Sequence, residues 1–142
     1  MAVRIVHTAD PEETEALGAQ LAAQLAPGDL VLVSGELGTG KTTLVRGAAR
    51  ALGVTDPVTS PTFAIGNRYT APGLTVSHLD LYRLADLQLE DPELLADYLG
   101  PGRIAFVEWP HASAPDLAQP RLRVTLTHAG EHRRTVAVEE PA

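Results

Sequence analysis

Apolar residues along the chain follow two patterns, and each pattern predicts a different kind of element. Leu17, Leu21 and Leu25 recur every four residues, directly after the acidic segment 10–13, which contains Pro11. This spacing places the leucines on one face of a helix, and an acidic first turn with an early proline is typical of a helix start. Residues 30–33 are instead apolar without interruption. That run indicates a strand buried on both faces of a parallel sheet.

The rest of the pattern predicts a second long helix, a short helix and further strands. Residues 41–52 have helical periodicity and are followed by Gly53, a residue that commonly ends helices. The inward side of this helix is expected to hold Leu44, Val45, Ala48, Ala49 and Leu52. The other expected elements are strands 3–7, 63–69, 74–81, 104–107, 121–127 and 134–138, and a short helix 91–99. Turn signals at 71–73 and near Gly130 predict two antiparallel hairpins.

Composition narrows the possible location and partners of the protein. The chain has no cysteine, no basic leader and no apolar stretch of about 20 residues, which is the length of a membrane span. We therefore expect a soluble, unprocessed cytoplasmic protein without disulfides or thiolate metal sites. The formal net charge is −7. Because RNA binding needs a basic patch, we expect any RNA to be held by a partner protein.

The strongest functional signal is Gly35-Glu36-Leu37-Gly38-Thr39-Gly40-Lys41-Thr42, a complete Walker A pattern. It joins the apolar strand 30–33 to the helix 41–52, and this arrangement directs backbone N–H groups and a helix N-terminus at a polyphosphate. Lys41 is the only lysine of the chain, whose other long basic side chains are all arginine. A compact ammonium suits contact with nucleotide phosphates better than a planar guanidinium does.

Positions within this loop predict roles in binding a nucleoside triphosphate with Mg²⁺. Lys41 is expected to bridge the outer phosphates and to act in catalysis, Thr42 to place its hydroxyl on Mg²⁺, and Thr43 to bind an inner phosphate. The loop residues expected to surround the phosphates are Gly35, Glu36, Gly38, Thr39 and Gly40, and the glycines allow close approach of the backbone.

This loop and the element pattern together predict one fold. We expect an α/β, three-layer fold like that of P-loop nucleoside triphosphatases, with a mostly parallel central sheet, antiparallel additions and a C-terminal hairpin. With 142 residues, of which 44% are hydrophobic, the chain suffices for one core. Residues 1–142 are therefore expected to form a single P-loop ATPase domain.

Two acidic residues at strand ends are candidates for the metal side of the site. Glu108 follows the apolar run 104–107, and Asp80 ends the alternating segment 76–80. Magnesium needs at least one nearby carboxylate. We favour Glu108 as the metal ligand and Asp80 as an outer ligand or water-positioning catalytic group. The alternative is that each acid caps the element that follows it.

Several other residues have more than one interpretation. Ser60 and Thr62 flank Pro61 and could form a nucleotide-sensing switch or an ordinary turn. His78 lies on the same strand face as Asp80, and we expect a hydrogen-bonding histidine of the core or rim rather than a catalytic one. Arg83 could contact phosphate or a partner, or form a solvated salt bridge. Trp109 could pack beneath the nucleotide, contact a partner or fill the core.

Four segments follow one another along the chain: the Walker A segment, Ser60-Pro61-Thr62-Phe63, His78-Leu79-Asp80-Leu81-Tyr82-Arg83 and Val107-Glu108-Trp109. In this order and spacing the chain resembles the TsaE (YjeE) family of small bacterial P-loop ATPases, over roughly residues 1–140. The block from His78 to Arg83 is far more specific than Walker A alone.

The resemblance implies a role in forming threonylcarbamoyladenosine (t6A) in tRNA. Family members bind ATP and Mg²⁺, join the TsaB and TsaD proteins, and reset that complex by slow ATP hydrolysis. By the same likeness, Thr42 and Glu108 would contact Mg²⁺ and Asp80 would be needed for hydrolysis. Thr8 and Arg133 would be contacts around the adenine. The tRNA would be met only through the complex, and no membrane would be involved.

Three other classes share a phosphate loop. A small P-loop kinase would need an acceptor pocket and a lid carrying arginine, and neither is evident in this chain. A GTPase normally reads guanine through an Asn-Lys-x-Asp motif, which the sequence cannot contain because Lys41 is its only lysine. A nucleotide-gated scaffold without hydrolysis stays open, because the sequence indicates a phosphate site but not turnover.

Overall fold

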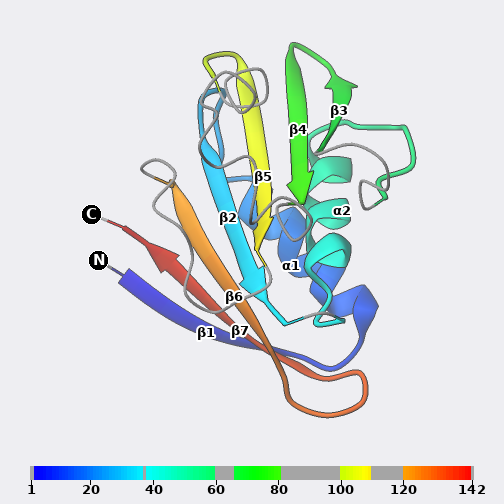
Figure 1. The fold of residues 1–142 in the computed structure, drawn as a ribbon, viewed down its shortest axis with the longest axis vertical. Helices are drawn as coiled ribbons and strands as arrows, with labels where there is room; N and C mark the ends of the chain where they lie inside the picture. Colours follow the sequence, from blue (N-terminus) through cyan, green and yellow to red (C-terminus); the bar gives the residue numbers. More distant parts are fainter. Residues whose placement is uncertain (1, 37, 60–65, 81–99, 110–119, 142) are drawn as a thin grey trace.

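A mixed β-sheet with two helices on one face forms the fold of the described residues (Figure 1). The computed structural model describes residues 2–36, 38–59, 66–80, 100–109 and 120–141. The helices are α1 (Pro11–Ala22) and α2 (Lys41–Ala51). The strands are β1 (Ala2–Thr8), β2 (Leu30–Gly35), β3 (Gly66–Ala71), β4 (Leu74–Asp80), β5 (Arg103–Trp109), β6 (Leu122–His128) and β7 (Arg134–Glu140).

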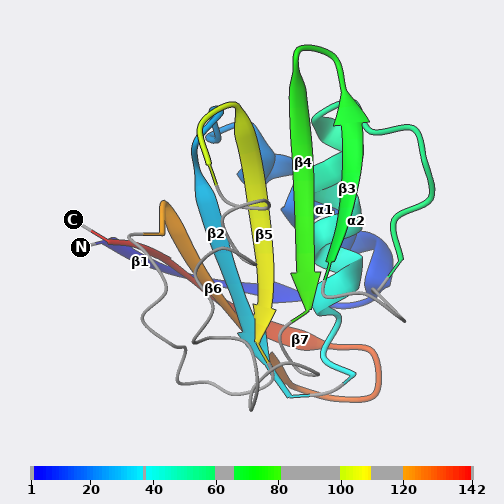
Figure 2. The same cartoon turned by 45° about the horizontal axis from the view of Figure 1, so that its top comes forward.

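The strands are ordered β1-β7-β6-β2-β5-β4-β3 in one seven-stranded sheet. Its centre is parallel, because β2 pairs with β5 and β6, and β5 pairs with β4, in parallel register. The pairs β3–β4, β6–β7 and β1–β7 are antiparallel (Figure 2). The predicted α/β class, with a parallel centre, antiparallel additions and a C-terminal hairpin, is confirmed. The expected helix 91–99 lies outside the described residues.

Strand β2 occupies the middle of the sheet, as its apolar run predicts. All six of its residues are buried. Val31 and Val33 belong to the core cluster that also contains residues of both helices, so they face α1 and α2. Leu32 points to the opposite face and is also buried, at 3% exposure. A strand covered on both faces needs no polar alternation.

Helix α1 begins with a reciprocal cap. Asp10 Oδ1 accepts a hydrogen bond from the Glu13 amide at 2.9 Å, and Glu13 Oε1 accepts one from the Ala9 amide at 2.9 Å. This arrangement is a variant of the capping box, because Glu13 bonds to the amide of Ala9, one residue before the N-cap Asp10. The helix ends at Ala22, however, before the predicted last turn at Leu25. Leu25 still packs against the core because the chain leaves the helix through a tight turn, in which its amide bonds to the Ala22 carbonyl.

Helices α1 and α2 cross at unusually short range, and this crossing places the helix that carries Lys41. A Cβ atom built on Gly47 would lie 1.9 Å from the Glu15 carbonyl oxygen, and one on Gly18 would lie 2.1 Å from the Leu44 carbonyl oxygen. Only glycine fits at these two positions without moving a helix. No described helix is long and apolar enough to cross a membrane.

Candidate functional site

The predicted phosphate loop connects the end of β2 to the start of α2, at the carboxyl edge of the parallel strands (Figure 1). Gly40 precedes the first turn of α2 in the left-handed region, with φ 95°, and no side chain caps the helix. Gly35 leaves β2 so close to β6 that a Cβ atom would lie 2.7 Å from the Leu126 carbonyl oxygen. The uncapped N-terminus of α2 provides amide donors for an anion.

Lys41 folds back over this loop. Its Nζ donates to the carbonyl oxygens of Gly35 and Glu36, at 2.7 Å and 3.0 Å. Burial lowers the pKa of Lys41 from its ordinary value, while the charges of Glu108 and Asp80 act in the opposite direction and raise it. A partly buried ammonium that is held by neutral carbonyls would gain much from a negatively charged ligand.

The two acidic candidates lie side by side at the ends of neighbouring strands. Asp80 on β4 and Glu108 on β5 are partners in the parallel register, so their side chains project from the same sheet face. Glu108 is buried at 3% exposure, and Asp80 is half-buried. Thr42 donates its hydroxyl to Glu108 Oε2 at 2.9 Å. The structure therefore brings Lys41 and Thr42 close to Asp80 and Glu108, which lie far from the loop in sequence.

His78 supports this acidic edge from within the core. The ring is completely buried, and Nε2 makes a hydrogen bond to Glu108 Oε2. Its Nδ1 atom has no hydrogen-bond partner in the part of the chain that the structure describes. His78 is thus the hydrogen-bonding core histidine that the sequence predicts. Its contact with Glu108 depends on strand register, which the local pattern of residues does not predict.

A cavity of about 130 Å³ adjoins the phosphate loop. It is lined by Pro11, Thr14, Gly38, Thr39, Gly40, Thr43, His132 and Arg134. Thr8, expected near the adenine, does not line it but bonds through its hydroxyl to the lining residue Thr14, at 2.8 Å. Arg133, the other expected adenine contact, is exposed and lies outside the lining.

Arg134 contacts the phosphate loop, although no pattern in the sequence assigns it to the site. Its Nε donates to the Thr39 carbonyl at 3.0 Å and its Nη2 to the Gly38 carbonyl at 3.1 Å. Its Nη1 donates to the carbonyls of Gly130, Glu131 and Arg133. No motif surrounds Arg134, and the pairing of β7 with β1 and β6 determines its place beside the loop. The sequence contains no local signal for this contact.

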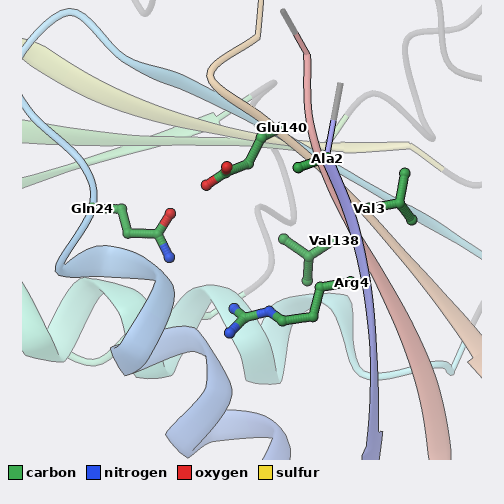
Figure 3. Close-up of a pocket in the computed structure, with 6 residues that line it drawn as sticks. All are labelled: Ala2, Val3, Arg4, Gln24, Val138 and Glu140. Carbon is green, nitrogen blue, oxygen red and sulfur yellow. The ribbon is translucent and has the colours of Figure 1, made fainter.

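Two larger hollows lie away from the loop. One, of about 270 Å³, is bounded by β1, β7 and the turn that follows α1, with Arg4, Gln24 and Glu140 in its lining (Figure 3). The other, of about 510 Å³, is an open groove between α1 and α2. Neither is lined by a predicted site residue, so size alone does not identify the functional site.

Some predicted site residues have no described position. Ser60, Thr62 and Arg83 lie outside the described residues, and Trp109 is described only as the end of β5. Within the described ranges there is no group of three or more histidine and acidic residues arranged to hold a metal. A magnesium ion here would rely on one or two carboxylates together with phosphate and water, which is its usual mode with nucleotides.

Comparisons with known proteins show similarity over most of the chain. A family model described as "Threonylcarbamoyl adenosine biosynthesis protein TsaE" matches residues 8–136. A Bacillus subtilis (strain 168) protein named tRNA threonylcarbamoyladenosine biosynthesis protein TsaE is 40% identical, covering 91% of this chain and 80% of its own. A Streptomyces coelicolor protein of the same name is 42% identical over 80% and 78% of the two chains. The crystal structure of Bacillus subtilis YdiB superposes with a TM-score of 0.78 at 33% identity, covering 99% of this chain and 87% of that one.

Proposed function

The chain belongs to the TsaE family, and from this membership we infer that it acts in the biosynthesis of tRNA threonylcarbamoyladenosine. We further propose that it does so as a P-loop ATPase that binds ATP with Mg²⁺ and hydrolyses the nucleotide slowly. The observation that carries this proposal is the convergence of Lys41, Thr42, Asp80 and Glu108 at one edge of the sheet.

Binding of the triphosphate depends on the loop and on Lys41. The Lys41 ammonium donates to two main-chain carbonyl oxygens of the loop, and burial lowers its pKa. In the complex, charged phosphate oxygens would accept the Lys41 hydrogen bonds in place of the neutral carbonyl oxygens. Such charge-assisted hydrogen bonds are roughly twice as strong as hydrogen bonds between neutral groups. The amides at the start of α2 would donate to the same phosphates.

The residues present fit a magnesium ion. Glu108 is a buried carboxylate already bonded to the Thr42 hydroxyl, and these two groups supply the oxygen ligands that Mg²⁺ prefers. When bound, the ion neutralises charge on the outer phosphate oxygens. Asp80 is the register partner of Glu108 on the neighbouring strand, and this position supports the proposal that Asp80 orients a water molecule near the same phosphates.

The small cavity beside the loop is the proposed place for the nucleoside. It is lined by residues of the loop, of α1 and of the β6–β7 connection, and it includes Thr43 directly after the proposed Mg²⁺ residue. The predicted adenine contacts Thr8 and Arg133 would act at the margin of this cavity. We expect hydrolysis to be slow alone and to be stimulated by the TsaB and TsaD proteins, because the sequence indicates no clear arginine finger.

Thermal unfolding of the purified chain tests nucleotide binding. A ligand present at about a thousand times its Kd stabilises the folded protein by about 4 kcal/mol, so the more tightly bound nucleotide gives the larger rise in melting temperature. We expect ATP with Mg²⁺ to raise the melting temperature more than GTP with Mg²⁺. Lys41→Ala should abolish the ATP shift. Arg50→Ala is the matched control, because Arg50 is an exposed cation on the same helix whose partner is Glu15. Equal shifts with both nucleotides would count against adenine selectivity.

Phosphate release separates an ATPase from a nucleotide-gated scaffold. Asp80→Ala should keep the ATP-dependent thermal shift and lose phosphate release, because Asp80 is assigned to water positioning rather than to binding. Full hydrolysis by this variant would remove Asp80 from the active site. Binding without turnover by the unmodified chain, even with TsaB and TsaD present, would favour the scaffold.

A further inference from the structure

Arg134 links the C-terminal hairpin to the phosphate loop through main-chain groups on both sides. Two of its nitrogens donate to loop carbonyls, those of Gly38 and Thr39. The third nitrogen donates to three carbonyls of the β6–β7 connection. A guanidinium has five N–H donors in a fixed plane, so it can span two segments in a way that an ammonium cannot.

The carbonyls that Arg134 holds determine where the loop amides point. A trans peptide places its N–H opposite its C=O, so fixing the Gly38 carbonyl also fixes the Thr39 amide. That amide points into the loop, where it donates to the Glu36 carbonyl at 3.3 Å. The Glu36 carbonyl in turn accepts from Lys41 Nζ. Fixing the Thr39 carbonyl orients the Gly40 amide at the start of α2 in the same way.

We propose that Arg134 is a positioning residue, which shapes the phosphate loop through its outward carbonyls so that its inward amides are set for a polyphosphate. This inference rests on the proposed function, because it assumes that the loop binds a triphosphate. It does not require Arg134 to touch the nucleotide. A positioning role and an adenine contact therefore give different predictions. If Arg134 positions the loop, its replacement must also weaken the affinity for a polyphosphate that carries no base.

The test compares ATP with inorganic tripolyphosphate, each with Mg²⁺, by calorimetry on the full chain. Arg134→Gln removes both the positive charge and the planar set of guanidinium donors. Arg134→Lys keeps the charge but removes the planar set of donors. Both variants should weaken both ligands by about tenfold, which is a measurable shift in Kd. Arg121→Gln is the matched control, because Arg121 directly precedes β6 and its ion-pair partner is Glu140, at 3.8 Å. It should bind both ligands as the unmodified chain does.

Each contrary result would assign Arg134 a different role. Loss of ATP affinity with unchanged tripolyphosphate affinity would make Arg134 a nucleoside contact and overturn the proposal. Unchanged affinity in Arg134→Lys would show that charge alone matters, and would also overturn it. A lower melting temperature with unchanged affinities would refute positioning and make the role purely structural. If the unmodified chain binds neither ligand, the proposed function itself fails, whereas intact binding by all variants refutes only the role of Arg134.

Discussion

At the scale of single residues, Glu108 connects three other residues of the acidic edge. It accepts from Thr42, bonds to the buried ring of His78 and stands beside Asp80 in the strand register. A buried carboxylate with several partners has a restricted orientation, and a metal ligand benefits from such restriction. The contact with His78 therefore belongs to the site even though His78 is too deeply buried to meet a nucleotide.

Replacement of Glu108 should separate metal binding from nucleotide binding. In Glu108→Gln the ATP affinity measured without Mg²⁺ should stay close to that of the unmodified chain, while the gain on adding Mg²⁺ should fall by about tenfold. The reason is that the amide keeps the shape of the side chain but not the charge that Mg²⁺ needs. Calorimetry with Mg²⁺ and with a chelator measures both quantities.

The control for this substitution is Glu139→Gln, which removes a charge from β7 without touching the site. In this control, the increase in ATP affinity on adding Mg²⁺ should equal that of the unmodified chain. An undiminished magnesium effect in Glu108→Gln would show that another group binds the ion. Melting temperatures of both variants reveal whether loss of the His78 partner has disturbed the fold.

At the scale of elements, the crossing of α1 and α2 determines where the phosphate-binding helix lies. Gly18 and Gly47 bring each helix within reach of the other's main chain. Leu17, Leu21, Leu44 and Val45 then join one core cluster with the sheet. Because α2 begins at Lys41, any shift at the crossing is transmitted along a rigid helix to the site.

A single methyl group at this crossing should destabilise the protein. Alanine is favoured over glycine by about 1 kcal/mol in an open helix, but forced overpacking costs about 1–3 kcal/mol. With a Cβ only 1.9 Å from the Glu15 carbonyl oxygen, the steric cost should exceed the helical gain. We expect Gly47→Ala to lower the free energy of unfolding by about 1–2 kcal/mol in urea titration. ATP affinity should fall with it.

The exposed ion pair at the same crossing provides the comparison. Arg50→Ala removes the bond from Arg50 Nη1 to Glu15 Oε1, at 2.6 Å, between side chains that are 60% and 29% exposed. Such a pair contributes little, so we expect a change of about 0.5 kcal/mol or less. If Gly47→Ala proved as stable as the unmodified chain, the close approach of the two helices would make no measurable contribution to the free energy of unfolding.

At the scale of the whole molecule, charge limits how the protein can meet RNA. The net charge is −7. RNA binding is driven largely by neutralising phosphates with basic side chains, and an acidic surface opposes it. A role in tRNA modification therefore calls for partner proteins that hold the RNA, which agrees with the proposed TsaB and TsaD complex.

The corresponding experiment is a titration of labelled tRNA with the purified chain, followed by fluorescence anisotropy. At about 0.15 M salt we expect no saturable binding below about 100 μM protein, which is the weak end of nonspecific affinities. The same titration with TsaB and TsaD added should show binding. Micromolar affinity of the chain alone would mean that its few arginines form a functional basic patch.

Local sequence determined much of this fold and of its phosphate site. The uninterrupted apolar run made β2 a central strand, since only a fully buried strand lacks polar alternation. Asp10 and Glu13 began α1 by bonding to amides three and four residues away. The Walker A glycines formed the loop because its turns need conformations that other residues rarely adopt. Each of these effects acts between near neighbours in the chain.

Tertiary structure decided the contacts between segments that are distant in sequence. The pairing of β4 with β5 set Asp80 beside Glu108 and brought His78 to the same carboxylate. The return of β7 to the sheet carried Arg134 to the phosphate loop, 95 residues from its partner Thr39. Such contacts depend on strand order and register, which arise from packing of the whole core. No local pattern of residue types encodes them, because periodicity gives the face of a strand but not its neighbour.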